Sequence, residues 1–282
     1  MNHLTAHRTR RLVALVAALG LVVTACGDDS SSSGSADTTA APSESSVAST
    51  ETTAPVAGEP VIDPGDDGNY QPEIDPADFV AVIDNPYLPL VPGSRWSYEE
   101  TNEDGQIEDI DYLVTDQTRE IAGVTTTVIR DTVTIEGVAE ETTLDFFAQD
   151  REGNVWYFGE EVSNYDENGD LLDHDGSFEV GVDGALPGIV MEADPQVGDA
   201  YRQEYYLGEA EDMGEVIRSG ETVSVPAGDY VDVLVTRDWN PLEPEVIEEK
   251  YYAPGVGIVR EVTVAGHTGE GVLVDVEIVP SP

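Results

Sequence analysis

Three oxygen-bearing side chains alternate along one short stretch: Asp166, Asn168 and Asp170, in YDENGDLL. A calcium-binding loop presents its first ligands at this spacing. The sixth and twelfth positions of such a loop, which need Gly and Glu, are Leu171 and Ser177 here. Those two residues break the calcium pattern, and a hairpin turn accounts for the same stretch. The sequence leaves both interpretations open.

Carboxylate pairs are the second kind of chemistry that the residue types allow. Glu160 and Glu161 follow an aromatic run, and Glu209 and Asp212 follow Tyr205-Tyr206. Two carboxylates at the right separation hydrolyse glycosidic bonds. Because the chain has 58 acidic residues, spacing alone does not single out a pair. A hydrolase acting on envelope glycan is therefore an alternative function, and a charged loop is the simpler explanation of residues 209–212.

Other signatures of catalysis or cofactor binding are missing from the sequence. His174 and His267 have no further ligands at zinc-site separations, so we interpret both as residues of solvated turns. The sequence has no nucleophile elbow, phosphate loop or dinucleotide fingerprint. We therefore predict no cofactor.

The N-terminus has the features of an export signal. Three arginines precede an apolar run from Leu12 to Val23, followed by small residues that end at Cys26. The last four, Val-Thr-Ala-Cys, resemble the bacterial lipobox, in which the Cys is acylated and the chain is cut before it. Cys26 is the only cysteine, so no disulfide competes for it. The resemblance implies a protein anchored by lipid to the outer face of the cell membrane.

Composition divides the rest of the chain into a tether and one domain. Residues 26–78 are rich in Ser, Thr, Ala, Pro and acids, with no basic residue, so they cannot bury enough apolar surface to fold. Residues 79–282 are long enough for a single sizeable core. We predict a signal peptide over 1–25, a disordered tether over 26–78 and a globular domain over 79–282.

The charge balance excludes one class of partner. After removal of residues 1–25 the net charge is −49, and residues 79–282 alone carry 46 acidic and 9 basic side chains, or −37. A field of this sign repels phosphate backbones, so we predict no nucleic-acid binding. Oligomeric state is not determined by the sequence.

An offset of 105 residues relates two parts of the domain. Phe146-Phe147-Ala148 corresponds to Tyr251-Tyr252-Ala253, and Ala122-Gly123 corresponds to Ala227-Gly228. Gly93 and Trp96 likewise correspond to Gly198 and Tyr201. Several sites with one shared offset indicate an internal repeat, over about 93–156 and 198–262.

The repeat leads to a prediction of fold class. Val and Thr are plentiful, turns recur about every ten residues, and no stretch sustains a helical period. We predict an all-β domain in which two meander repeats form a single curved antiparallel sheet or an open barrel. Few or no helices are expected apart from the signal peptide. Successive side chains of a strand point to opposite faces, so one ring of each aromatic pair should be core and the other should face away.

The insert between the repeats, residues 157–197, is the expected place for a site, because function commonly lies on loops carried by a regular scaffold. Its apolar stretch GVDGALPGIVM is too rich in Gly and Pro for a strand interior. It either plugs the open sheet or lines a pocket. The candidate ligand-binding residues in and around it are Trp156, Phe158, Leu186, Ile189, Tyr205 and Tyr206.

Four stretches, DREGNVWYFGEE, GVDGALPGI, DAYRQEYYLGEAEDM and PLEPEVIEEKYYAPGVGIV, resemble an uncharacterised family of bacterial extracytoplasmic proteins and lipoproteins. The resemblance covers about residues 85–279 and implies an exported β-rich domain, without an activity to carry over. We expect a lipid-anchored binding or envelope-maintenance module. An apolar concave face of its sheet would hold a lipid-like or peptide ligand.

Overall fold

The computed structural model describes residues 70–102 and 105–281. Apart from a three-residue 3-10 helix, η1 (Pro76–Asp78), the regular structure in these residues is β-strand. No helix in this part of the chain is long and apolar enough to cross a membrane. The strands up to the middle of the domain are β1 (Phe79–Val80), β2 (Arg95–Thr101), β3 (Ile107–Ile121), β4 (Val124–Ile135), β5 (Val138–Asp150), β6 (Val155–Tyr165), β7 (Leu171–Asp173), β8 (Phe178–Glu179) and β9 (Leu186–Met191). Those that follow are β10 (Ala200–Arg202), β11 (Glu204–Tyr205), β12 (Met213–Val225), β13 (Gly228–Trp239), β14 (Ile247–Ala253), β15 (Gly257–Ala265) and β16 (Glu270–Glu277).

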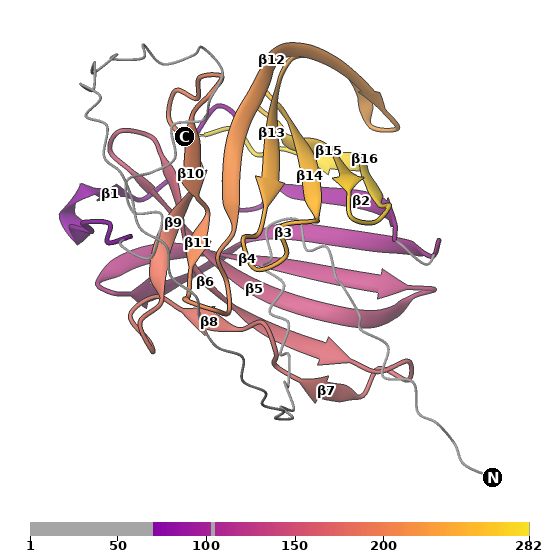
Figure 1. Ribbon diagram of the computed structural model, residues 1–282, viewed down its shortest axis with the longest axis horizontal. Helices are drawn as coiled ribbons and strands as arrows, with labels where there is room; N and C mark the ends of the chain where they lie inside the picture. The colour runs from indigo at the N-terminus through magenta and orange to yellow at the C-terminus, as the bar shows by residue number, and fades with distance from the viewer. Residues whose placement is uncertain (1–69, 103–104, 282) are drawn as a thin grey trace, which may run out of the picture. The chain divides into compact units, whose positions relative to one another are not determined.

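The described strands form one antiparallel sheet (Figure 1). Its order runs from β10 through β12, β13, β14, β15, β16, β2, β3, β4, β5, β6 and β9 to β11. β1 pairs with β5, and β7 and β8 pair with β6, beside this path. Two up-and-down meanders, β2 to β6 and β12 to β16, are joined where β16 pairs with β2. The predicted all-β fold, with one curved sheet made of two meanders, is confirmed.

The two ends of the sheet meet in a short segment of chain. β10 pairs with β12 at one end of the order, and β11 pairs with β9 at the other. Only Gln203 separates β10 from β11. The sheet is therefore a nearly closed barrel with one seam, which this segment bridges. Gly188 in β9 permits the bridge, because a β-carbon there would overlap the backbone of Arg202 and Gln203.

Strand bounds in the two meanders agree with the 105-residue offset. It carries the bounds of β3 and β4 to within one residue of those of β12 and β13. The pairing differs, since Phe146 is opposite Val128 whereas Tyr251 is opposite Val235. By the offset, Val128 corresponds to Val233, so the β13–β14 register differs from the β4–β5 register by two residues. A common origin of the two meanders stays a prediction.

The aromatic pairs do separate onto opposite faces, as expected for a strand. Phe147 and Tyr252 lie in the interior core of the barrel. Phe146 lies in a second apolar cluster on the outer face, with Val128, Phe158 and neighbours. The expectation that one ring of each pair faces away from a core is wrong for Phe146. The second cluster forms because the segment that includes Ile74 and Phe79 covers this face.

The N-terminal boundary of the folded part also differs from the prediction. Tyr70 is 5% exposed, and its hydroxyl donates to the carbonyl of Pro187 in β9 (2.8 Å). Its ring makes an edge contact with Tyr205 in β11. The domain thus includes residues assigned to the tether, because one aromatic ring in a polar stretch can dock on a preformed surface. The predicted signal peptide, Cys26 and the tether up to residue 69 lie outside the described residues.

Candidate functional site

The interior of the barrel changes character along the strands. In β2, Trp96, Tyr98 and Glu100 alternate and are all buried, so they share the inner face. The apolar residues come first and the carboxylate last. In β5, which runs the opposite way, Glu141 and Asp145 come first and Phe147 follows. One end of the barrel interior is therefore apolar and the other is acidic.

The same arrangement recurs around the sheet. Carboxylates occupy inward positions at the end of the barrel formed by the turns that follow β2, β4, β13 and β15. We name this set, together with the single base that lies in it, the acidic belt. Its members are Glu100, Glu108, Asp131, Glu141, Asp145, Glu160, Glu204, Asp212, Asp238, Glu248, Lys250 and Glu261. Glu248 and Asp212 are half-buried and the others are buried.

The expectation of an apolar concave face is therefore wrong for this end of the barrel. The apolar end is filled by aromatic and aliphatic side chains. A void among Leu88, Trp96, Tyr98, Tyr112 and Ile258 measures only about 10 Å³, about the least that a single water molecule needs. A hydrocarbon chain has no room in that void.

Two glycines shape the belt. Asp145 is opposite Glu160 and Phe147 is opposite Tyr157, so β6 has one extra residue between these pairs. This bulge, at Gly159 (φ +119°), turns Glu160 onto the inner face. A β-carbon on Gly159 would overlap the carbonyl of Phe178, where β8 crosses. Gly271 in β16 lies opposite both Glu100 and Glu261, and its missing side chain leaves space between their carboxylates.

Burial raises the pKa values of the belt carboxylates, and their mutual repulsion adds to the effect. The pKa of Glu100 rises to about 8 through burial and the charge of Glu108. Burial raises the pKa of Asp145 to about 7, although a hydrogen bond from Tyr157 opposes the shift. The pKa values of Asp131 and Glu160 lie well above the usual range, through burial and the charge of Asp145. The belt disfavours its own full ionisation.

Several belt oxygens have no hydrogen-bond partner of standard geometry among the described residues. These are both oxygens of Glu160, Glu204 and Glu261, and one each of Glu100 and Asp131. Three of these carboxyl groups have a weaker contact, from Tyr157 to Glu160, from Asp212 to Glu204 and from Glu248 to Glu261. Leaving a buried polar group without a good partner costs about 1–3 kcal/mol, and more for a charged group. A stronger hydrogen-bond donor or a cation at these oxygens would therefore be stabilising.

Lys250 is the only lysine of the sequence, and it lies inside the belt. Its ammonium is 3.2 Å from Asp238 Oδ2. Burial alone would lower the pKa of Lys250, but the carboxylates of Asp238 and Glu261 raise it well above its usual value. Lys250 therefore remains charged and partly neutralises its surroundings.

The predicted ligand-binding residues lie mostly at the seam, beside the belt. Trp156 in β6 is opposite Ile189 in β9, and Leu186 in β9 is opposite Tyr205 in β11. The Trp156 indole donates to Asp150 (2.8 Å). The remaining two candidates, Phe158 and Tyr206, lie apart from these four. Phe158 packs in the outer cluster, and Tyr206 is half-buried in the turn after β11.

The predicted calcium ligands Asp166, Asn168 and Asp170 form a turn. Asp166 Oδ1 accepts from the backbone N–H of Asn168 (2.8 Å) and of Asp170 (2.9 Å), as in a hairpin turn. In the described part of the chain no three Asp, Glu, His or Cys side chains gather as a metal site.

Of the hydrolase candidates, Glu160 and Asp212 belong to the belt and repel one another. Glu161 instead pairs with Arg119 on the outer face, and Glu209 is exposed.

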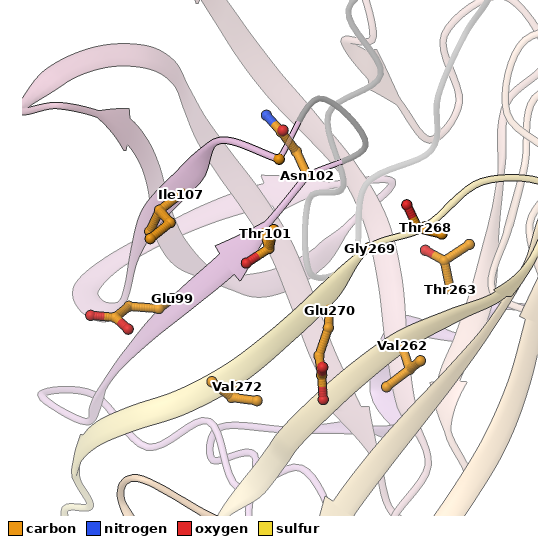
Figure 2. A pocket seen from close by; sticks show the side chains of 11 residues that line it. Glu99, Thr101, Asn102, Ile107, Val262, Thr263, Thr268, Gly269, Glu270 and Val272 are labelled. Carbon is orange, nitrogen blue, oxygen red and sulfur yellow. The ribbon is translucent and has the colours of Figure 1, made fainter.

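A groove of about 560 Å³ lies at the acidic end, on the outer face. Figure 2 shows that its lining side chains come from the neighbouring ends of β2, β3, β15 and β16. They mix apolar, hydroxyl and carboxylate groups: Glu99, Thr101, Asn102, Ile107, Val262, Thr263, Thr268, Glu270 and Val272. The Glu270 carboxylate is already paired with Arg260 (2.8 Å). The groove therefore has less concentrated charge than the belt and selects no particular ligand.

Comparisons with known proteins assign no activity to these residues. No protein-family model matches the chain, and no curated protein matches it significantly. Among solved structures, a predicted exported protein with a YmcC-like fold from Bacteroides fragilis is similar at a TM-score of 0.38 and 16% identity, over 70% of this chain and 100% of the other. A predicted lipoprotein from Parabacteroides distasonis gives a TM-score of 0.39 and 13% identity, over 68% and 99%. Similarities of this size transfer no function to this chain.

Sequence reasoning missed the acidic belt. One usable signal was the two-residue period that places Glu100 on the face of Trp96 and Tyr98. The other was the single lysine, Lys250, immediately before an aromatic pair. Neither signal is distinctive in a chain with 58 acidic residues.

Proposed function

We propose that this chain is an extracytoplasmic lipoprotein that binds a positively charged ligand at the acidic end of its barrel. The single observation behind the ligand class is the excess of inward carboxylates over the one inward base, Lys250, with several carboxylate oxygens lacking a partner of standard geometry. Aromatic rings such as Tyr157 and Tyr252 lie next to these carboxylates, and such rings attract ammonium groups.

A lipid-like ligand fits this interior less well. The apolar end is occupied by the protein's own side chains, and the void of about 10 Å³ there is far below the few hundred Å³ typical of ligand pockets. A small organic cation needs carboxylates and ring faces more than it needs an apolar cavity. The acidic end of the barrel has carboxylates and aromatic rings close together.

The ligand class is tested by calorimetric titration of the mature chain at physiological ionic strength. Spermidine is the cationic probe, and laurate and glutarate are the lipid-like and anionic comparisons. We expect a saturating isotherm for spermidine and none for the other two probes. Saturable binding of laurate with no response to spermidine would overturn the proposal.

The anchor rests on the lipobox resemblance at Cys26 and is tested separately. Cys26→Ser removes the thiol that would be acylated, so the variant should leave the membrane fraction or accumulate as an uncleaved precursor. Membrane fractionation and intact-mass measurement distinguish these products from the acylated chain. Unchanged detergent partitioning of the variant would remove the anchor from the proposal.

A further inference from the structure

The acidic belt contains two groups of four residues, here called halves, that differ in charge balance; its other four members lie on β2, β3 and β11 and just before β12. The β13–β15 half contains Asp238, Glu248, Glu261 and the ammonium of Lys250. Asp238 also accepts from Thr236 (2.5 Å) and Gln203 (3.0 Å). This half therefore holds a bound primary ammonium group that the chain itself provides.

The β4–β6 half contains Asp131, Glu141, Asp145 and Glu160, and no base of the described residues faces it. Arg130 is exposed on the opposite face of β4. Arg119 is engaged on the outer face with Glu161 (3.1 Å) and with Glu179 (2.5 Å). Glu160 is 2% exposed, and neither of its oxygens has a partner of standard geometry. No cation of the described residues lies beside these carboxylates, and their raised pKa values favour the protonated, uncharged form until a cation binds.

The two halves correspond through the 105-residue offset. Asp145 precedes Phe146-Phe147, and Lys250 precedes Tyr251-Tyr252. Both side chains point inward, two residues before an inward aromatic ring. One meander thus has an ammonium group where the other has a carboxylate. Both meanders place inward carboxylates around this position, and only the second meander also places a lysine there.

We infer that the β4–β6 half binds the ammonium group of an external primary amine, in the way that the β13–β15 half binds Lys250. This inference rests on the proposed function and names its ligand class. Glu160 would be its main contact, and Asp131 and Asp145 would add negative charge nearby. Tyr112 lies beside Asp131 and Asp145, and Tyr157 donates to Asp145 Oδ1 (2.8 Å), so both hydroxyl groups lie next to the same carboxylates. Because more than one carboxylate has no cation beside it, small diamines suit the half better than monoamines.

The first test is a calorimetric titration of the mature chain with 1,4-diaminobutane. Glu160→Gln keeps the shape of the side chain and removes the carboxyl group that would ionise against a bound ammonium, so it should weaken binding at least tenfold. Glu161→Gln, the next residue on the same strand but outward, is the matched control and should stay within twofold of the wild type. Equal affinities for wild type and Glu160→Gln would overturn the inference. If binding were instead lost in Glu261→Gln, the cation site would lie in the other half and only the proposed function would stand.

A second variant tests the correspondence with Lys250. Asp145→Lys places an ammonium group where the other meander has one, so the folded variant should lose diaminobutane binding and unfold at a higher temperature. Far-UV circular dichroism confirms the β-fold before titration. A folded Asp145→Lys variant that binds diaminobutane like the wild type would contradict the inference. A wild-type chain that binds neither spermidine nor diaminobutane would overturn the proposed function itself.

Discussion

At the scale of residues, the unusual feature is a buried ammonium group, that of Lys250, with several carboxylates around it. Lys250 is buried against Asp238, while Glu248 and Glu261 lie close enough to raise its pKa. Breaking a buried pair by removing one partner is costly, because the other charge stays behind in a poor solvent for ions. The lysine is therefore more important to stability than its position in an acidic sequence indicates.

Lys250→Met tests this role. We expect a loss of about 3–5 kcal/mol in the free energy of unfolding, measured by urea denaturation at neutral pH. Arg260→Met is the control, since Arg260 pairs with Glu270 near the surface and should cost at most about 1 kcal/mol. Equal losses for the two variants would show that the belt carboxylates are neutral around Lys250.

At the scale of elements, the seam depends on a close approach between β9 and the β10–β11 segment. Gly188 lies directly beneath the backbone of Arg202 and Gln203. Tyr70 contacts both sides of the seam, through its hydrogen bond to Pro187 in β9 and its ring contact with Tyr205 in β11. At Gly188 the seam therefore closes by direct contact between backbone atoms, so no side chain can move to make room for a larger residue.

Gly188→Ala should open the seam. A methyl group there forces the β10–β11 segment away from β9, so hydrogen exchange should rise in residues 186–205 and the unfolding midpoint should fall. Gly271→Ala is the control, because a β-carbon at that position meets only the Glu100 carboxylate, at 3.5 Å. Protection of the seam that is the same in both variants would show that it does not need glycine.

At the scale of the whole molecule, the belt sets how stability responds to pH. Carboxylates whose pKa is raised by folding bind more protons in the folded than in the unfolded state. Stability is then greatest below the unfolded pKa values and declines as the pH rises through the folded ones. For Glu100 this window extends from about 4.5 to about 8. Lys250 acts only at higher pH, since its own pKa is raised.

The unfolding midpoint should therefore fall between pH 4.5 and pH 8.5. Each proton that only the folded state retains contributes about 1.4 kcal/mol per pH unit within its window. Thermal unfolding followed by circular dichroism at constant ionic strength measures the trend. Glu100→Gln should flatten it, because that side chain then has no proton to lose. A midpoint that rises over this range would mean that the belt carboxylates are ionised and compensated in the folded protein.

Local patterns in the sequence were sufficient for the fold class. The two-residue period separates Phe146 from Phe147, and the turn residues Ala122-Gly123 mark the β3–β4 hairpin. Both properties depend on neighbours along the chain. The 105-residue offset likewise predicted two meanders, and the sheet contains them.

The acidic belt was decided by tertiary structure alone. Alternation shows which residues share a face of a strand, but not which face a closed sheet turns inward. Glu100 is inward because the sheet closes, and Glu160 is inward because the bulge at Gly159 shifts the alternation by one residue. The placement of Lys250 opposite Glu261 depends in the same way on the pairing of β14 with β15. Burial of these charges follows from contacts between strands that are distant in sequence, and no local pattern encodes such contacts.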